Sequence, residues 1–105
     1  MEMDGSVKIG FFGCGNVGSG VWKLLDGFAE EIAHRTGLRF QVKRVLVRDL
    51  QKKREIAFPA GVLTDRIDDL LNDDEISIIL EFLGGEEPAH AYLTAALERG
   101  KTVVT

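Results

Sequence analysis

The stretch that decides the fold reads Lys8-Ile9-Gly10-Phe11-Phe12-Gly13-Cys14-Gly15-Asn16-Val17-Gly18. Its first five residues form a short, mostly apolar run, which is typical of a strand buried inside a sheet. Glycines follow at positions 13, 15 and 18, and a helical apolar pattern begins at about Asn16. The stretch therefore predicts a buried strand, a tight glycine turn and a helix, in that order.

Each glycine of this turn has a separate physical task. Gly13 lets the chain turn sharply after the strand, Gly15 lets a ligand approach the backbone, and Gly18 lets the helix and the strand pack closely. The helix directs its first unpaired N–H groups and the positive end of its dipole at the same place, so we expect an anion there. In its strand–turn–helix context the pattern indicates the pyrophosphate of a dinucleotide. The alternative is a tight turn that binds no ligand.

The rest of the chain alternates between strand and helix patterns. We expect strands at residues 8–12, 40–47, 62–63, 76–83 and 102–104. We expect a helix at residues 16–35 and a second helix after a cap at Thr64 or Asp65. Glu86, Glu87 and Pro88 open a third, with the proline in its first turn, and Gly100 ends it. Such alternation predicts helices packed on a parallel sheet. The expected fold class is therefore α/β, a Rossmann-type doubly wound parallel sheet, with residues 1–105 forming a single domain.

The first expected helix carries an apolar stripe at helical spacing, formed by Val17, Val21, Leu24, Leu25, Phe28 and Ile32. A stripe of this kind normally faces the core. We therefore expect all of its members to pack against the sheet. Trp22 lies at the flank of the stripe, where partial packing explains it better than a binding role.

The end of the second strand bears on the choice of cofactor. An acidic residue at this strand tip accepts hydrogen bonds from the ribose 2′-hydroxyl of NAD, whereas an arginine accommodates the 2′-phosphate of NADP. Here Arg48 occupies the tip, Asp49 comes one residue late, and the basic run 52–54 follows. The pattern favours NADP(H), or use of both cofactors, over strict use of NAD(H). The alternative is that Arg48 pairs with Asp49 or with a neighbouring acid on the surface.

Residues 76–83 are strongly apolar and predict a strand that is buried on both faces. Glu81 is the exception, because a carboxylate near the end of a central strand is costly unless it is paired or exposed at the crevice. Gly84 and Gly85 then predict a turn. Parallel strands share their direction, so this turn lies at the same carboxyl edge as the glycine loop, where ligands of open parallel sheets bind.

Composition excludes several classes of function. The chain is 45% hydrophobic and 29% charged, as in ordinary globular proteins, and its formal charge of −4 argues against a nucleic-acid surface. Its apolar stretches are too short to span a bilayer, and its acidic start is unlike a signal peptide, so we expect a cytoplasmic protein. Cys14 is the single cysteine, which excludes an internal disulfide and a multi-cysteine metal site. We expect no metal site.

With these residues in hand, the sequence resembles the N-terminal, nucleotide-binding domain of homoserine dehydrogenase. The resemblance covers nearly the whole chain and rests on four motifs: Gly-x-Gly-x-Val-Gly-Ser-Gly-Val at 13–21, Val-Arg-Asp at 47–49, Glu-Phe-Leu-Gly-Gly at 81–85, and Gly-Lys-x-Val-Val-Thr at 100–105. The first motif is shared widely among dinucleotide folds. The last three, in this order and spacing, are more specific.

The resemblance implies a role for several residues. Pyrophosphate contacts would come from Gly13, Gly15, Asn16, Val17 and Gly18. The family usually has threonine at the position of Asn16, and either side chain donates to a phosphate. Arg48 would meet the adenosine ribose or its phosphate, and Gly84 and Gly85 would lie near the nicotinamide.

The family reduces aspartate semialdehyde to homoserine, and its active-site lysine follows the closing Val-Val-Thr. The resemblance thus implies a chain cut before the catalytic domain, with no catalytic residue among its own, and a full-length enzyme that is a homodimer. Two alternatives stay open. One is another dehydrogenase with the same first domain, of the aspartate or sugar type. The other is a standalone regulatory module that senses NAD(P)H.

Overall fold

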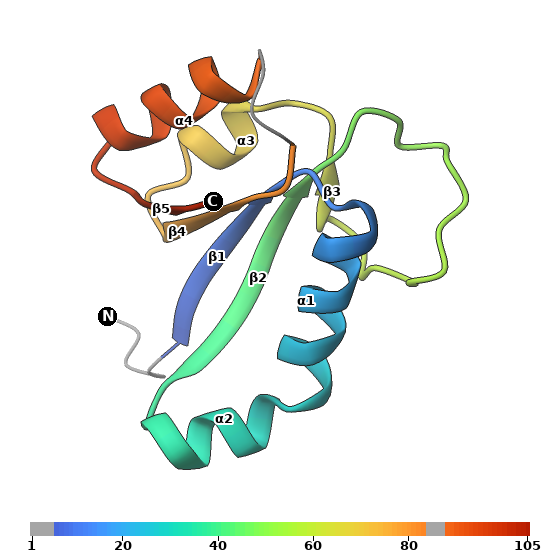
Figure 1. The fold of residues 1–105 in the computed structure, drawn as a ribbon, viewed down its shortest axis with the longest axis vertical. Helices are drawn as coiled ribbons and strands as arrows, with labels where there is room; N and C mark the ends of the chain where they lie inside the picture. The colour runs from blue at the N-terminus through green and yellow to red at the C-terminus, as the bar shows by residue number, and fades with distance from the viewer. Residues whose placement is uncertain (1–5, 84–87) are drawn as a thin grey trace.

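The computed structural model describes residues 6–83 and 88–105. In these ranges the chain forms a parallel sheet in the order β3-β2-β1-β4-β5 (Figure 1). The elements are β1 (Ser6–Phe12), α1 (Gly15–Gly27), α2 (Ala29–Thr36), β2 (Arg39–Leu46), β3 (Leu63–Thr64), α3 (Asp68–Leu71), β4 (Ile76–Glu81), α4 (Ala89–Glu98) and β5 (Thr102–Val104). The predicted Rossmann-type doubly wound fold is confirmed.

Helices cover both faces of the sheet, as Figure 1 shows. Side chains of α1 pack with one core cluster, which contains Phe11, and side chains of α3 and α4 pack with the other, which contains Phe12. Both phenylalanines are fully buried. Consecutive residues of β1 point to opposite faces, so β1 is the strand on which both layers are built.

Gly10 allows α3 to approach the sheet. A Cβ atom at Gly10 would lie 2.8 Å from Leu70 Cδ2, 3.1 Å from Ile79 Cδ1 and 3.2 Å from Ile76 Cγ2. Leu70, Ile76 and Ile79 are themselves fully or almost fully buried. The space that a side chain at Gly10 would occupy is therefore filled by the end of the Leu70 side chain from α3.

The expected long helix is wrong in two respects. It breaks at Phe28, whose φ of −116° and ψ of 24° are not helical, so that α1 and α2 are separate helices. The predicted stripe also splits: Val21 and Leu25 pack on the core, while Val17, Leu24 and Phe28 are 70%, 53% and 52% exposed. The cause is the close approach at Gly18, which turns the face formed by residues 18, 21, 22 and 25 toward the sheet. Val17 and Leu24 lie about 100° around the helix from this face, and Phe28 lies beyond the last helical residue, Gly27.

Two other expectations need correction. Strand β4 ends at Glu81 and is not buried on both faces, because Ile78 and Leu80 are only half-buried and Ser77 is exposed. Neither Thr64 nor Asp65 directly caps α3, which begins at Asp68. Instead the Thr64 hydroxyl accepts the Arg66 N–H at 3.1 Å and donates to Asp69 Oδ2 at 2.5 Å, so it organises the turn before the helix.

An ionic cluster joins the elements at the amino edge of the sheet. Lys43 Nζ lies 2.7 Å from both Asp73 Oδ2 and Glu75 Oε1. Buried Lys101 donates to the carbonyl oxygens of Asp73 and Ile76 at 2.8 and 2.6 Å. Partial burial alone would raise the pKa of Asp73, but the hydrogen bonds from Lys43 and from the Glu75 backbone outweigh it and the pKa is lowered. The cluster lies away from the glycine turn and is structural.

We expect Gly10→Val to lower the free energy of unfolding by roughly 1–3 kcal/mol, because overpacking a filled core forces side chains off their rotamers. Urea denaturation measures the change. Gly20→Ala is the matched control, since nothing lies within 4 Å of a Cβ atom at Gly20 in α1. The control should be stabilising by about 0.4–1 kcal/mol. An unchanged midpoint for Gly10→Val would contradict the close packing of α3 on β1.

We also expect Asp73 to contribute to acid sensitivity. A carboxyl group whose pKa is lowered in the folded state stabilises the fold above its unfolded pKa, and that contribution is lost as the pH falls through the folded pKa. Between about pH 5 and pH 2, the wild-type chain should therefore lose more unfolding free energy than Asp73→Asn. The asparagine retains the acceptor for the Glu75 N–H. Parallel losses in the two proteins would show that Asp73 is not the linked group.

Candidate cofactor site

The glycine turn after β1 has the backbone geometry that the sequence predicts. Gly13 has a φ of +85°, its N–H donates to the Leu46 carbonyl at 2.9 Å, and a Cβ atom there would lie 2.7 Å from Leu83 Cδ2. Gly15 has a φ of +58°, and nothing lies within 4 Å of its Cβ position. The positive φ and the contact with Leu83 therefore both require glycine at position 13. Gly15 instead leaves open space above the backbone.

Helix α1 begins directly at this open space. Its N-cap residue, Cys14, makes no side-chain capping hydrogen bond, and its first turn contains no acidic residue. The N–H groups of a first helical turn lack partners within the helix. Together with the positive end of the helix dipole, they make this turn a site for an anion.

Gly18 lets the start of α1 pack closely against Phe82. A Cβ atom at Gly18 would lie 3.2 Å from Phe82 Cδ2 and 3.4 Å from Cys14 Sγ. The Phe82 ring in turn packs edge-on against Phe11, with ring centroids 5.1 Å apart. The predicted close packing at Gly18 is thus confirmed, and its partner is the residue that follows β4.

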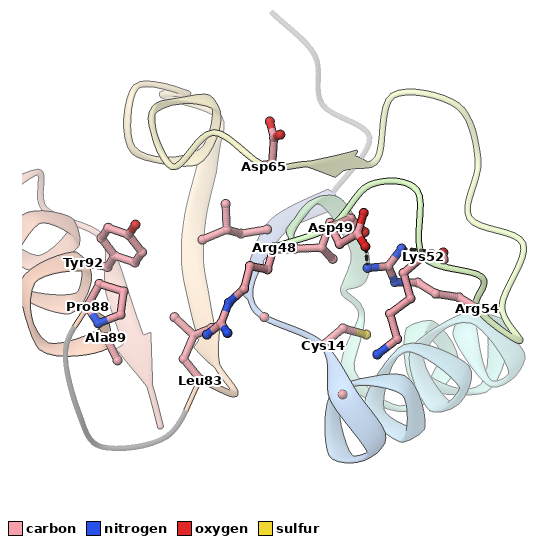
Figure 2. A pocket seen from close by; sticks show the side chains of 14 residues that line it. Cys14, Arg48, Asp49, Lys52, Arg54, Asp65, Leu83, Pro88, Ala89 and Tyr92 are labelled. Carbon is pink, nitrogen blue, oxygen red and sulfur yellow. Dashed lines mark hydrogen bonds between the residues drawn. The ribbon is translucent and has the colours of Figure 1, made fainter.

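A crevice of about 620 Å³ opens above the turn (Figure 2). This volume lies within the usual range of about 300–1,000 Å³ for ligand pockets. Its lining consists of Gly13, Cys14, Gly15, Leu46, Val47, Arg48, Asp49, Lys52, Arg54, Asp65, Leu83, Pro88, Ala89 and Tyr92. These residues follow the carboxyl ends of strands or begin helices, so the crevice lies where strand order reverses between β1 and β4.

Arg48 lies in the crevice as an exposed cation. Within the described ranges its side chain makes no ion pair, so the alternative pairing with Asp49 is not observed there. Asp49 instead accepts the Gln51 N–H at 2.9 Å through Oδ1. Figure 2 shows the Arg48 side chain reaching past the glycine turn toward Leu83.

Glu81 has the pairing that its position requires. Its Oε2 atom accepts the backbone N–H of Leu83 at 2.5 Å. The carboxylate therefore holds the chain where it leaves β4, beside the glycine turn. This confirms the expectation that a carboxylate here is paired or exposed.

The remaining predicted site residues are placed as follows. Asn16 and Val17 are exposed in the first turn of α1 but do not line the crevice. Gly84 and Gly85 lie outside the described residues. The nearest described residues on either side of the undescribed segment 84–87, Leu83 and Pro88, do line the crevice.

The sequence analysis named none of four lining residues as a binding residue in its own right: Lys52, Arg54, Asp65 and Tyr92. The carboxyl-edge rule could have found Asp65, because it follows β3 directly. Tyr92 gave no signal beyond its place on the packing face of α4, where its ring contacts Phe12 with centroids 6.0 Å apart. The separate roles of Lys52 and Arg54 depend on how the loop folds.

The residues that the structure describes offer neither a metal-binding group nor a membrane-spanning helix. No three histidine, cysteine, aspartate or glutamate side chains there are grouped so that they could hold a metal ion. None of the helices there has the length and apolar character needed to cross a membrane.

Comparison with known proteins agrees with this geometry. Residues 13–105 match the family described as homoserine dehydrogenase, NAD binding domain. The homoserine dehydrogenase of Bacillus subtilis is 39% identical over 100 residues, which cover 95% of this chain and 23% of that enzyme.

Solved structures give the same result. The homoserine dehydrogenase of S. aureus at pH 7.0 superposes with a TM-score of 0.87 and 37% identity, over 93% of this chain and 25% of that one. The enzyme of Thiobacillus denitrificans gives a TM-score of 0.84 and 40% identity, over 95% and 23%. This chain thus spans about a quarter of the length of these relatives, and it belongs to the homoserine dehydrogenase family, whose NAD-binding domain it matches.

Proposed function

We propose that this chain is the cofactor-binding part of a homoserine dehydrogenase and that it binds NADP(H) in preference to NAD(H). The observation that carries the proposal is the crevice itself, in which a positive-φ glycine turn meets an uncapped helix start. Membership of the family supports a nicotinamide cofactor. The preference between the two cofactors rests on the charges around the crevice.

The pyrophosphate would bind above the first turn of α1. Gly13 and Gly15 bring the backbone close to it, while the first N–H groups of the helix, around Asn16 and Val17, offer hydrogen bonds to its oxygens. Gly18 acts indirectly, because its contact with Phe82 holds the helix against the sheet. One end of the cofactor would then extend toward Leu83 and, as the resemblance implies, toward Gly84 and Gly85, and the other toward the loop that follows β2.

The charges near the end of β2 favour a phosphate on the ribose. The lining carries the cations Arg48, Lys52 and Arg54 against the acids Asp49 and Asp65. Asp49 uses one carboxylate oxygen within its own loop, which reduces its capacity to accept from a ribose hydroxyl. The guanidinium of Arg48 starts from the same strand end and, once turned from Leu83 toward the loop after β2, would bind the phosphate through paired, charge-assisted hydrogen bonds.

In the full-length enzyme, the bound cofactor would supply the hydride that, together with a proton on the carbonyl oxygen, converts aspartate semialdehyde to homoserine. This chain's own residues bind and orient the nucleotide, and none of them is assigned a catalytic role. Substrate binding belongs to the rest of the longer protein, which we propose to be a cytoplasmic homodimer that serves amino-acid biosynthesis.

We expect calorimetric titration to show tighter binding of NADPH than of NADH, and Arg48→Ala to weaken NADPH binding about tenfold while leaving NADH unchanged. A charge-assisted hydrogen bond at an exposed site contributes about 1.5 kcal/mol, which corresponds to this factor. Arg66→Ala is a matched control, because Arg66 is exposed and does not line the crevice. Equal loss for both nucleotides would place Arg48 at the pyrophosphate, and no binding of either would overturn the proposed function.

We expect the isolated chain to show no oxidation of homoserine with NADP⁺. Hydride transfer requires the substrate carbon to be held against the nicotinamide, and we assign that task to the parts of the longer enzyme that this chain does not match. Nucleotide absorbance measures turnover, with the full-length Bacillus subtilis enzyme as the positive control. Measurable turnover by the purified chain would show that its own residues also bind the substrate.

A further inference from the structure

The loop that follows β2 folds around the guanidinium of Arg54. Nη2 of Arg54 donates to the Asp49 carbonyl oxygen at 2.7 Å, and Nη1 donates to the Lys52 carbonyl oxygen at 3.0 Å. The Asp49 side chain holds the same loop from its other side by accepting the Gln51 N–H. Side-chain hydrogen bonds from Asp49 and Arg54 thus hold residues 49–54, the first part of this loop, in a closed turn.

The three consecutive cations of this loop therefore have different environments. Arg54 is half-buried and uses both terminal nitrogens on backbone carbonyls. Lys53 is exposed and does not line the crevice. Lys52 is exposed, lines the crevice, and makes no side-chain hydrogen bond or ion pair within the described part of the chain.

Figure 2 shows where these side chains point. Lys52 extends from the loop toward the start of α1, close to Cys14 in this view, whereas the guanidinium of Arg54 stays inside the loop. Arg48 lies on the other side of the glycine turn, toward Leu83. A nucleotide that crosses the turn would thus have Lys52 on the side of the loop after β2.

We infer that Lys52 is a specificity-determining contact for the ribose 2′-phosphate and that Arg54 is a positioning residue, which binds no phosphate itself. The inference rests on the proposed binding of NADP(H). Arg54 acts by fixing the backbone at Asp49 and Lys52, so that the ammonium of Lys52 is held on the crevice side before the cofactor arrives. Preorganisation of this kind reduces the entropy lost on binding.

The competing account gives Arg54 a direct contact with the phosphate. An arginine has five donors, so a guanidinium held in the loop could still offer a hydrogen bond to a ligand. The two accounts differ in how the effects of Lys52 and Arg54 combine. A positioning residue acts through Lys52 and has no separate effect once Lys52 is removed, whereas a second ligand contributes independently.

A double-mutant cycle on this chain tests the inference, with calorimetric Kd values for NADPH and NADH. We expect Lys52→Ala to weaken NADPH binding about fivefold to tenfold and Arg54→Gln about threefold to tenfold, with NADH unchanged. The double variant should stay within about twofold of Lys52→Ala. Lys53→Ala is the matched control and should bind both nucleotides as the wild type does.

Two further measurements separate positioning from a general loss of structure. Arg54→Lys should restore part of the NADPH affinity, because an ammonium also donates to the two loop carbonyls. Hydrogen exchange at the Gln51 and Lys52 N–H groups should be faster in Arg54→Gln, with an unfolding midpoint close to that of the wild type. Unchanged exchange would overturn the positioning role.

The outcomes also distinguish this inference from the proposed function. Multiplicative losses in the double variant would make Arg54 a direct ligand, and an unaffected Lys52→Ala would remove Lys52 from the site. Equal loss of NADPH and NADH binding in Lys52→Ala would place Lys52 at the pyrophosphate, because its side chain extends toward the start of α1. Each of these results overturns the inference while the NADPH preference and its dependence on Arg48 stand. A wild-type chain that binds NADH as tightly as NADPH overturns the cofactor preference, and the inference with it.

Discussion

The rest of the structure depends on close packing around β1, where three glycines let neighbouring elements approach. Gly10 admits Leu70 from α3, Gly13 fits beside Leu83, and Gly18 lets the start of α1 lie on Phe82. Each contact joins β1, its turn or the start of α1 to a residue much later in the chain. Because these contacts fix the first turn of α1 over the carboxyl edge of the sheet, packing in the core also sets the position of the anion site.

This dependence explains which features the sequence could predict. The strand, turn and helix at 8–18, the pairing of Glu81 and the order of elements follow from local residue types and from the direction of parallel strands. The outward position of Val17, Leu24 and Phe28 does not, because periodicity identifies an apolar stripe without fixing its angle to the sheet. That angle is set by the contact between Gly18 and Phe82, which are distant in sequence.

The basic run 52–54 shows the same limit at the site. The sequence shows only three positive charges in a row. The structure distinguishes them, because Arg54 donates hydrogen bonds to the carbonyls of Asp49 and Lys52. The loop also explains why Asp49 lies one residue beyond the strand tip, because its side chain accepts the Gln51 N–H and stabilises the turn there. On the proposed function, cofactor choice is thus a property of the folded loop as well as of its residue types.

The same crevice explains why binding and catalysis would be divided within the longer enzyme. Its rim is formed by exposed residues, among them Arg48, Asp49, Lys52, Leu83 and Pro88. On the proposed function, an open rim would let a charged nucleotide enter and reach the cations, and would leave water in contact with its reacting end. Hydride transfer is favoured where water is excluded. On the proposed function, an open, charged cleft suits recognition of the cofactor, and closure over the nicotinamide would fall to other parts of the longer enzyme.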